Sequence, residues 1–439
     1  MQRILKASNV LGAVGLLIAA GCGDDATLVD GTFTEAEWSL IETMSPLPDV
    51  PADPTNAVAD DAGAATLGQM FFHETSHAGA IVTADDGSNG GLGTVGETGK
   101  VSCASCHQPG VWFHDERSNP NGTSLAADWG GRNTPTVVNA AFYSWFKWAG
   151  GSDTMWSQAL GTTESGKSHA STRLAVAHMI YDKYKTEYEA VFETMPDLSD
   201  TGRFPLTGKP KASDSDPDGD WEGMTQTDQD STNRILANFA KAISAYQRLL
   251  VSRNAPFDQY VAGSFDAISA AAKRGLRLFI GKAGCQECHS SPLFSDNSFH
   301  NLGVPQTGDN VSSEDTGRYG AVAKLLASTF NSAGAYADVA STRLDNLSQT
   351  EDMRGQFRTK HLRQIALTAP YMHTGQLVDL TAVVEFYNQG GGSADFDGTK
   401  DQLLVPLNLT TAEVADIVAF LETLTGDPVP TALTADTSR

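Results

Sequence analysis

The sequence has few cysteines, few basic residues and no long apolar run after its first 22 residues. Lys and Arg number 30 against 53 Asp and Glu, and the net charge of −23 argues against a basic face that binds nucleic acid or anionic lipid headgroups. No later segment approaches the roughly 20 apolar residues that a transmembrane helix needs. At 439 residues, 40% of them hydrophobic, the chain is long enough for two globular domains. A protein partner would present a basic patch to it.

The first residues have the form of an export signal. Arg3 and Lys6 precede an apolar run over Val10–Ala20 that is too short to span a bilayer. Small residues then precede Cys22, as in a bacterial lipobox. We expect a lipoprotein signal peptide over residues 1–22, lipidation of Cys22 in the inner or outer membrane, and a mature chain in the periplasm. An ordinary secretory signal with an incidental cysteine is the alternative.

The remaining four cysteines decide the class of protein, because every one lies in a C-x-x-C-H motif. The motifs are Cys103-Ala104-Ser105-Cys106-His107 and Cys285-Gln286-Glu287-Cys288-His289. This spacing is typical of c-type haem attachment, in which two thiols form thioethers to the porphyrin and the histidine ligates the iron. The alternatives are two disulfides, a thioredoxin-like redox motif, or a zinc site split between the two pairs. A histidine after both pairs favours two covalently bound c-type haems.

Helical periodicity dominates the rest of the chain, and few stretches alternate as strands do. We expect helices at residues 172–194, 233–250, 266–280, 380–387 and 410–424. Loops are expected at residues 79–99, 197–230 and 306–350. The expected fold class is mainly α, with two cytochrome-c-like haem domains packed together and long irregular loops. The expected divisions are a tether over 23–60, an N-terminal haem domain over 61–250 and a C-terminal haem domain over 251–430.

The segments that flank the haem motifs are more specific than the motifs themselves. After the first motif come Arg132–Asn139, which reads Arg-Asn-Thr-Pro-Thr-Val-Val-Asn, and Gln158–Gly161. After the second come Ser298–Gly303 and Ala366–Gly375. With these segments the chain resembles the dihaem cytochrome c peroxidase and MauG family from about Leu67 to about Gly426.

The resemblance implies that the N-terminal haem, held by His107, is the one that reacts with peroxide. Classical peroxidases of the family ligate the other side of this iron, in the resting state, with a histidine from the loop before the Asn-x-Pro-Thr segment. The matching stretch here, residues 121–131, contains no histidine, and His114 does not align. The iron is therefore expected to be open on its distal side, as in MauG-like enzymes.

The resemblance gives the C-terminal haem His289 as its proximal ligand. The sixth ligand in the peroxidases is a methionine, and the matching position is Tyr387, as in MauG and its relatives. A phenolate donates charge and lowers the reduction potential, whereas methionine raises it. The alternative is that Tyr387 is a packed helix residue and that Met372 or Met353 ligates the iron.

The family's catalytic residues match this chain only in part. A tryptophan between the haems matches Trp148, which would let the two irons share oxidising equivalents. Gln158 matches a distal hydrogen-bond donor. The family's acid–base glutamate, ten residues later, falls on Ser168, which moves protons poorly. Glu164 and His169 are the nearby groups that could replace it, and each is equally explicable as a surface loop residue.

A calcium ion between the domains is usual in the family. Its ligands there are an asparagine side chain and two carbonyl oxygens, which match Asn133, Thr368 and Pro370. Oxygen ligands from separate segments suit this hard cation. Asn133 is equally explicable as a turn residue.

The leading functional expectation is a MauG- or MbnH-like peroxidase-type oxidoreductase. Hydrogen peroxide would create a high-valent dihaem state that oxidises a partner protein, and tryptophan side chains are the expected targets. One alternative is a cytochrome c peroxidase that takes electrons from a small redox protein. The other is a dihaem cytochrome that transfers electrons without catalysis, which the missing glutamate at Ser168 keeps open.

Overall fold

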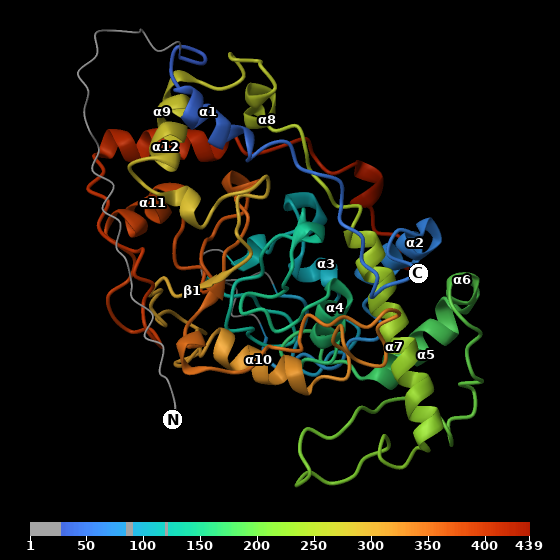
Figure 1. Cartoon of the computed structure of the whole chain (residues 1–439). Helices are drawn as coiled ribbons and strands as arrows, with labels where there is room; N and C mark the ends of the chain where they lie inside the picture. Colours follow the sequence, from blue (N-terminus) through green and yellow to red (C-terminus); the bar gives the residue numbers. More distant parts are fainter. Residues whose placement is uncertain (1–27, 85–90, 119–121) are drawn as a thin grey trace, which may run out of the picture.

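The computed structural model describes residues 28–84, 91–118 and 122–439. Twelve α-helices lie in these ranges: α1 (Glu35–Glu42), α2 (Ala62–His73), α3 (Cys103–Cys106), α4 (Met155–Thr163), α5 (Arg173–Lys183), α6 (Lys185–Val191), α7 (Gln226–Gln247), α8 (Pro256–Val261), α9 (Ala270–Ile280), α10 (Arg318–Ala327), α11 (Leu380–Asn388) and α12 (Thr411–Glu422). Their arrangement is shown in Figure 1. The expectation of a mainly α fold is confirmed. The expected signal peptide, with Cys22, lies outside the described residues.

The strands make a single two-stranded sheet in the part of the chain that the structure describes. β1 (Phe299–His300) pairs antiparallel with β2 (Phe357–Arg358), and Phe299 faces Arg358 in the register. This short ladder pairs the segment after the second C-x-x-C-H motif with the basic segment that contains Arg358.

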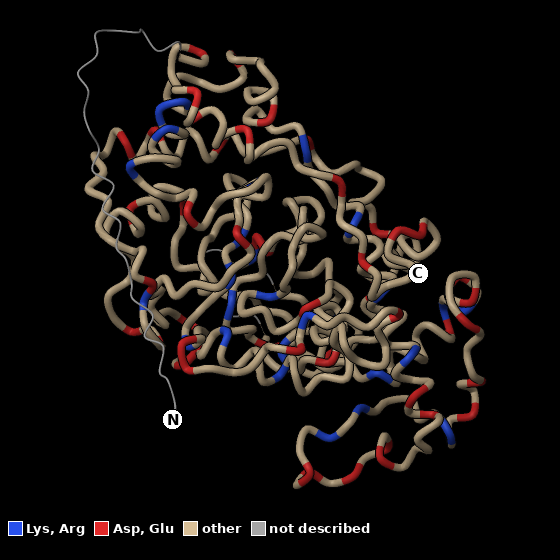
Figure 2. The backbone as a smooth tube through the Cα atoms, viewed as in Figure 1, with Lys and Arg blue, Asp and Glu red and all other residues tan. Residues whose placement is uncertain are grey.

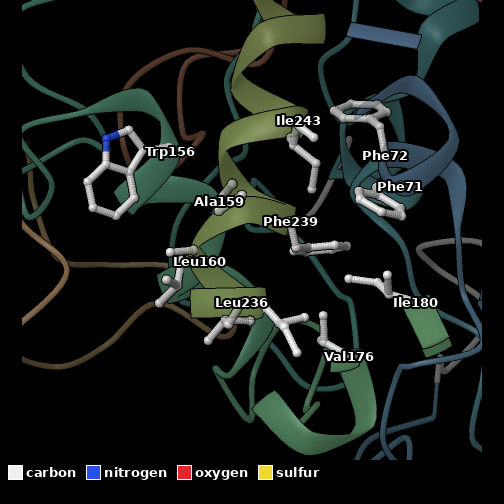
Figure 3. Close-up of a cluster of buried hydrophobic side chains, with 14 of the residues drawn as sticks. Phe71, Phe72, Trp156, Ala159, Leu160, Val176, Ile180, Leu236, Phe239 and Ile243 are labelled. Atoms are coloured by element: carbon white, nitrogen blue, oxygen red, sulfur yellow. The ribbon is translucent and has the colours of Figure 1, made fainter. Parts of the chain in front are cut away.

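The first hydrophobic cluster is built around α7. The helix begins after Thr225, whose hydroxyl accepts a hydrogen bond from the Asp228 amide, and so satisfies a backbone donor that the helix leaves free. Its apolar stripe is buried, as the sequence pattern predicts. Figure 3 shows Phe239 and Ile243 of α7 pointing toward Phe71 and Phe72 of α2. Side chains of α4 and α5 close the other sides of the cluster.

The second hydrophobic cluster is built around the crossing of α9 and α12. Four phenylalanine rings fill it at centroid distances of 5.1 to 6.2 Å, mostly edge to face: Phe257, Phe279, Phe294 and Phe420. Thr410 caps α12 in a capping box with Glu413. The cluster lies directly behind the second C-x-x-C-H motif, because Ala283 and Cys285 pack against it.

Each cluster contains one helix crossing that admits only glycine. In α2, a Cβ atom on Gly68 would lie 1.9 Å from the Ala242 carbonyl oxygen of α7. In α9, a Cβ atom on Gly275 would lie 1.9 Å from the Asp416 carbonyl oxygen of α12. The two halves therefore use the same device to bring a helix backbone against its partner.

The two ends of the described chain each pack on the other half of the molecule. Phe33, Ile41 and Met44, which flank or belong to α1, are buried in the second cluster. At the other end, the Gln69 side chain of α2 donates hydrogen bonds to the Ala432 and Ala435 carbonyls. Residues 28–60 thus differ from the tether expected over 23–60, because their apolar side chains have a buried face to fill.

Two other segments differ from the sequence prediction. The helix expected over 172–194 is two helices, α5 and α6, because the backbone turns at Tyr184, whose hydroxyl hydrogen-bonds the Glu74 carboxylate. The loop expected over 306–350 contains α10, whose Val322 and Leu325 are buried. Two buried apolar residues in ten are too weak a stripe to mark a helix among polar neighbours.

None of the helices in the described ranges is both long and apolar enough to cross a membrane. Figure 2 shows acidic residues spread over the outer loops, among them the long loop before α7, and basic residues also in the middle of the molecule. Both signs of charge also occur inside the molecule, since Asp115 and Asp153 are buried as well as Arg358 and Arg363.

We expect Gly68→Ala and Gly275→Ala each to lower the midpoint of thermal unfolding, because the added methyl group must push two helix backbones apart. Overpacking of this kind costs roughly 1–3 kcal/mol. Circular dichroism of the haem-loaded protein measures the effect. Gly166→Ala is the matched control, since nothing lies within 4 Å of a Cβ atom there. Equal midpoints for all three variants would contradict the close crossings.

Candidate active site

Two cavities lie in the middle of the molecule, and each contains one C-x-x-C-H motif. The first cavity, of about 300 Å³, is lined by Cys103, Cys106 and His107. The second cavity, of about 400 Å³, is lined by Cys285, Cys288 and His289.

Both motif histidines are held in the tautomer that a metal requires. His107 Nδ1 lies 3.2 Å from the Phe113 carbonyl oxygen, and His289 Nδ1 lies 2.9 Å from the Phe294 carbonyl oxygen. Because a carbonyl can only accept, each Nδ1 carries the proton and each Nε2 keeps its lone pair. Burial lowers the pKa of both histidines, that of His107 to about 4, so both rings are neutral. These geometries fit iron ligation.

The arrangement of the cysteines argues against two of the alternatives considered for them, the disulfides and the shared zinc site. None of the four described cysteines forms a disulfide. The two pairs line different cavities, so one zinc ion cannot collect all four thiols. In the described ranges the one group of three or more His, Cys, Asp or Glu with metal-site spacing is Cys288, Asp296 and His300. His300 in that group is already bound on both ring nitrogens by the carboxylates of Asp296 and Asp401.

Tyr387 lines the second cavity together with His289. Its hydroxyl makes no hydrogen bond with a described residue, and burial raises the pKa of the phenol. Met372 lines the same cavity, whereas Met353 does not. Of the candidates for the sixth ligand, the structure therefore brings Tyr387 and Met372 to the site and leaves Met353 outside it.

Trp148 lies in a wall that the two cavities share. Its indole Nε1 donates to the Asn133 carbonyl at 2.8 Å, which fixes the plane of the ring. The residues common to both linings are Asn133, Pro135, Thr136, Tyr143, Trp148, Arg358 and Lys360. An aromatic ring in this wall is placed to pass electrons between groups bound in the two cavities.

Two cations in this shared wall have no anionic partner among the described residues. Arg358 of β2 is buried, none of its three guanidinium nitrogens has a hydrogen-bond partner, and its Cζ lies 3.4 Å from the Tyr143 ring centroid. Lys360 Nζ lies 4.6 Å from the Trp148 ring centroid, and burial lowers its pKa well below the usual value. Unpaired buried charges are costly. The propionate groups of two haems would compensate these charges, so the residues present fit haem.

Of the distal residues considered for the first cavity, one does not line it. Gln158, Ser168 and His169 line it. Glu164 does not: its carboxylate is held by the Arg173 guanidinium through contacts of 2.7 and 2.9 Å. The structure therefore separates two acid–base candidates that the sequence left equal, and only His169 has access to the cavity.

Other residues that could bind the distal face of the iron follow from the rest of the lining. The described part of the loop before Asn133 contributes Ser124, Ala126 and Gly130, none of which is a strong iron ligand. His114 is buried elsewhere and does not line the cavity.

Sequence reasoning missed the basic lining of the first cavity. The basic residues in it are Arg132, Lys147, Lys167, Arg358 and Lys360, and the described lining contains no Asp or Glu. Arg132 is neutralised by Asp315 at 2.6 Å, whereas Lys147 has no partner among the described residues. The run Arg-Thr-Lys-His at 358–361 was the available signal in the sequence, but only the fold brings it to a cavity.

Asn133, Thr368 and Pro370, the residues matched to the family's calcium ligands, line the second cavity together. The Asn133 amide nitrogen donates to the Ser118 hydroxyl and the Gly122 carbonyl. Its side-chain oxygen accepts no hydrogen bond from a described residue, so it has a lone pair to offer a cation.

This chain is similar to known proteins over most of its length. A family model described as di-haem cytochrome c peroxidase matches residues 63–266. The cytochrome-c peroxidase IdrP1 of Denitromonas iodatirespirans is 33% identical, over 87% of this chain and 86% of the relative. The methylamine utilization protein MauG of Methylorubrum extorquens is 31% identical, over 76% of this chain and 75% of the relative. The crystal structure of a MauG-like protein associated with microbial copper homeostasis shares the fold, with a TM-score of 0.58 at 24% identity, over 90% of this chain and 99% of that one.

We expect Arg358→Met to lower the reduction potentials of both haems, because removing a buried cation favours the oxidised state of nearby iron. A fall of roughly 60 mV would correspond to a tenfold change for a one-electron couple. Spectroelectrochemical titration measures it. Arg203→Met, at an exposed arginine that is paired with Asp228, is the control and should leave both potentials unchanged. Unchanged potentials in Arg358→Met would place the propionates elsewhere.

Proposed function

This chain belongs to the di-haem cytochrome c peroxidase family, and from that premise we propose that it is a MauG-like enzyme that uses hydrogen peroxide to oxidise a partner protein. The family membership makes it a haem-dependent peroxidase-type oxidoreductase. The observation that carries the finer proposal is Tyr387 in the second cavity beside His289. Two covalently bound haems would supply the iron that reacts with peroxide and would hold its two oxidising equivalents.

The protein's own residues have distinct tasks in this proposal. His107 and His289 ligate iron through Nε2, and the four motif cysteines hold the porphyrins. Trp148, fixed by its hydrogen bond to Asn133, connects the two cavities. In the second cavity the Tyr387 phenolate stabilises a high oxidation state, since an anionic oxygen ligand lowers the reduction potential.

The first cavity binds and protonates peroxide. The Gln158 side chain is placed to donate a hydrogen bond to it, and His169 moves a proton from one peroxide oxygen to the other, which leaves as water. An open distal side is supported by the described part of the loop before Asn133, which brings no strong iron ligand to the lining. Oxidation of a partner protein, with tryptophan side chains as the natural targets, then proceeds by electron transfer through the protein rather than by substrate entry.

A second function has its own support. Met372 also lines the second cavity, and a relative with 33% identity is named a cytochrome-c peroxidase. A methionine-ligated haem of high potential would make the protein a peroxidase that takes electrons from a small redox protein. Export with a lipid anchor at Cys22, and calcium bound by Asn133, Thr368 and Pro370, are parts of either proposal.

The spectrum of the diferric protein separates the two functions. One high-spin and one low-spin haem by EPR, with a long-lived product from one equivalent of hydrogen peroxide and no prior reduction, is the result expected for the MauG-like enzyme. Two low-spin haems that react with peroxide only after one-electron reduction would identify the peroxidase. Two haems that do not react with peroxide, before or after reduction, would indicate a protein that only transfers electrons.

We expect Tyr387→Met to raise the reduction potential of the C-terminal haem by about 0.1 V or more, within the roughly 0.8 V that axial ligands span. The long-lived peroxide product should be lost, because the phenolate that stabilises it is gone. Tyr371→Phe is the matched control, since this second tyrosine of the same cavity already donates its hydroxyl to the Ile365 carbonyl at 2.7 Å. A Tyr387→Met protein that reacts with peroxide as before would contradict the proposed ligation.

We expect His169→Gln to slow the reaction of the diferric protein with peroxide roughly 100-fold or more, the usual share of a positioned acid–base group. Stopped-flow absorbance measures the rate. Glu164→Gln should weaken the ion pair with Arg173 and lower the thermal midpoint while leaving the rate unchanged. The opposite pattern would return the acid–base role to Glu164. If the N-terminal haem is low-spin in the parent protein and high-spin in His169→Gln, His169 is an iron ligand instead of an acid–base group.

A further inference from the structure

A second histidine stands behind His169, on the side away from the cavity. The rings of His77 and His169 lie 5.3 Å apart, centroid to centroid, and each residue is 3% exposed. His77 belongs to the short segment after α2, and the Gly79 amide donates to the His169 carbonyl, which keeps the two segments in register. Phe239 of α7 covers the other side of the His77 ring, at 5.6 Å.

Hydrogen-bond direction fixes the tautomer of His77. The Ser171 hydroxyl donates its single proton to the His77 carbonyl at 2.6 Å. Toward the His77 ring the same hydroxyl oxygen can therefore only accept, and His77 Nδ1, at 3.3 Å, carries the proton. His77 Nε2 is left with a lone pair, and it is buried without a partner among the described residues.

The two ring nitrogens of His169 have different surroundings. Nδ1 is buried and has no hydrogen-bond partner in the described part of the chain. Nε2 also forms no hydrogen bond, but it is not enclosed, and the residue lines the first cavity, so this nitrogen is the one that meets the cavity. His169 Nδ1 and His77 Nε2 are thus both buried without a partner, on rings 5.3 Å apart, and a proton on His169 Nδ1 would give the His77 lone pair a donor, directly or through a water.

We propose that His77 is a positioning residue that holds the His169 proton on Nδ1, so that His169 presents the lone pair of Nε2 to the first cavity as a base. This inference rests on the proposed function of His169. With haem bound, His169 would take a proton from one peroxide oxygen and return it to the other. That second oxygen would leave as water when the O–O bond breaks, and the haems would supply the two electrons.

The surroundings keep both rings neutral, which a hydrogen bond of this kind requires. Burial lowers the pKa of His77 to about 4 and that of His169 to about 3. The nearest charged group on the far side of His77 is Glu74, which is bound by Lys183 at 2.6 Å and by the Tyr184 hydroxyl at 2.5 Å. Because Glu74 is already engaged, the acceptor left to His169 Nδ1 is His77.

Cyanide binding tests the tautomer without turnover. At neutral pH the reagent is HCN, which must give its proton to a base as it binds ferric iron. The association rate measured by stopped flow on the haem-loaded protein should fall about 10- to 100-fold in His169→Gln and equally in His77→Phe. In the double variant the rate should fall no further, since His77 acts only through His169. His77→Gln, which keeps an acceptor near the position of Nε2, should restore most of the rate.

His73→Phe is the matched control, because His73 is also a buried histidine whose Nε2 has no partner among the described residues, and it does not line the cavity. Its rate should equal that of the parent. If cyanide binds slowly to His169→Gln but at the parent rate to His77→Phe, this inference is wrong and the proposed function of His169 stands. If cyanide binds to His169→Gln at the parent rate, both proposals are wrong. A protein inert to peroxide whose cyanide binding is slowed in both variants would overturn the proposed function alone.

Discussion

A guanidinium sealed from water without an anion beside it is the constraint on which the rest of this structure depends. Arg358 is in that position, with Lys360 two residues later, in a wall common to both cavities. Such charges are stable only when a bound anion compensates them. Two haems, each with two propionates, would meet this need if they occupied the cavities that Arg358 and Lys360 line. The fold and its cofactors are therefore linked, because the wall that separates the cavities is charged until they are filled.

The remaining structure holds that wall in place. Each half brings one helix backbone against another at a glycine, Gly68 in the first and Gly275 in the second, so neither helix pair can slide without a clash. The ends of the described chain cross between the halves, with α1 on the second cluster and the segment after α12 on the first. The proposed electron transfer through Trp148 would need a fixed spacing between two cofactors, and these crossings hold the two halves together.

The sequence alone predicts features that depend on neighbours along the chain, but it does not predict contacts between residues that are far apart in the sequence. The C-x-x-C-H motifs, the α7 stripe and the Thr410 cap depend on neighbours along the chain, so the sequence alone predicts them. Tyr387 emerged only through the resemblance to a family, because nothing near it in the chain marks an iron ligand. Glu164 and His169 are five residues apart and equal as sequence, and only the ion pair with Arg173 distinguishes them. Arg358 meets Tyr143 across more than 200 residues, a contact that no local pattern encodes.

The basic lining of the first cavity bears on the proposed acid–base role of His169, because an imidazole and a carboxylate would respond to it differently. A carboxylate there would face Lys147, which has no other partner, and an ion pair would hold the carboxylate away from its task. A neutral imidazole whose proton is held by His77 forms no such pair, and it keeps its lone pair for peroxide. In the proposed reaction, negative charge would develop on the peroxide oxygens as that proton leaves, and the cations of the lining, Lys147 and Arg358 among them, would stabilise it. The serine at position 168 and the basic lining around it would then act together, on a chain whose net charge is otherwise negative.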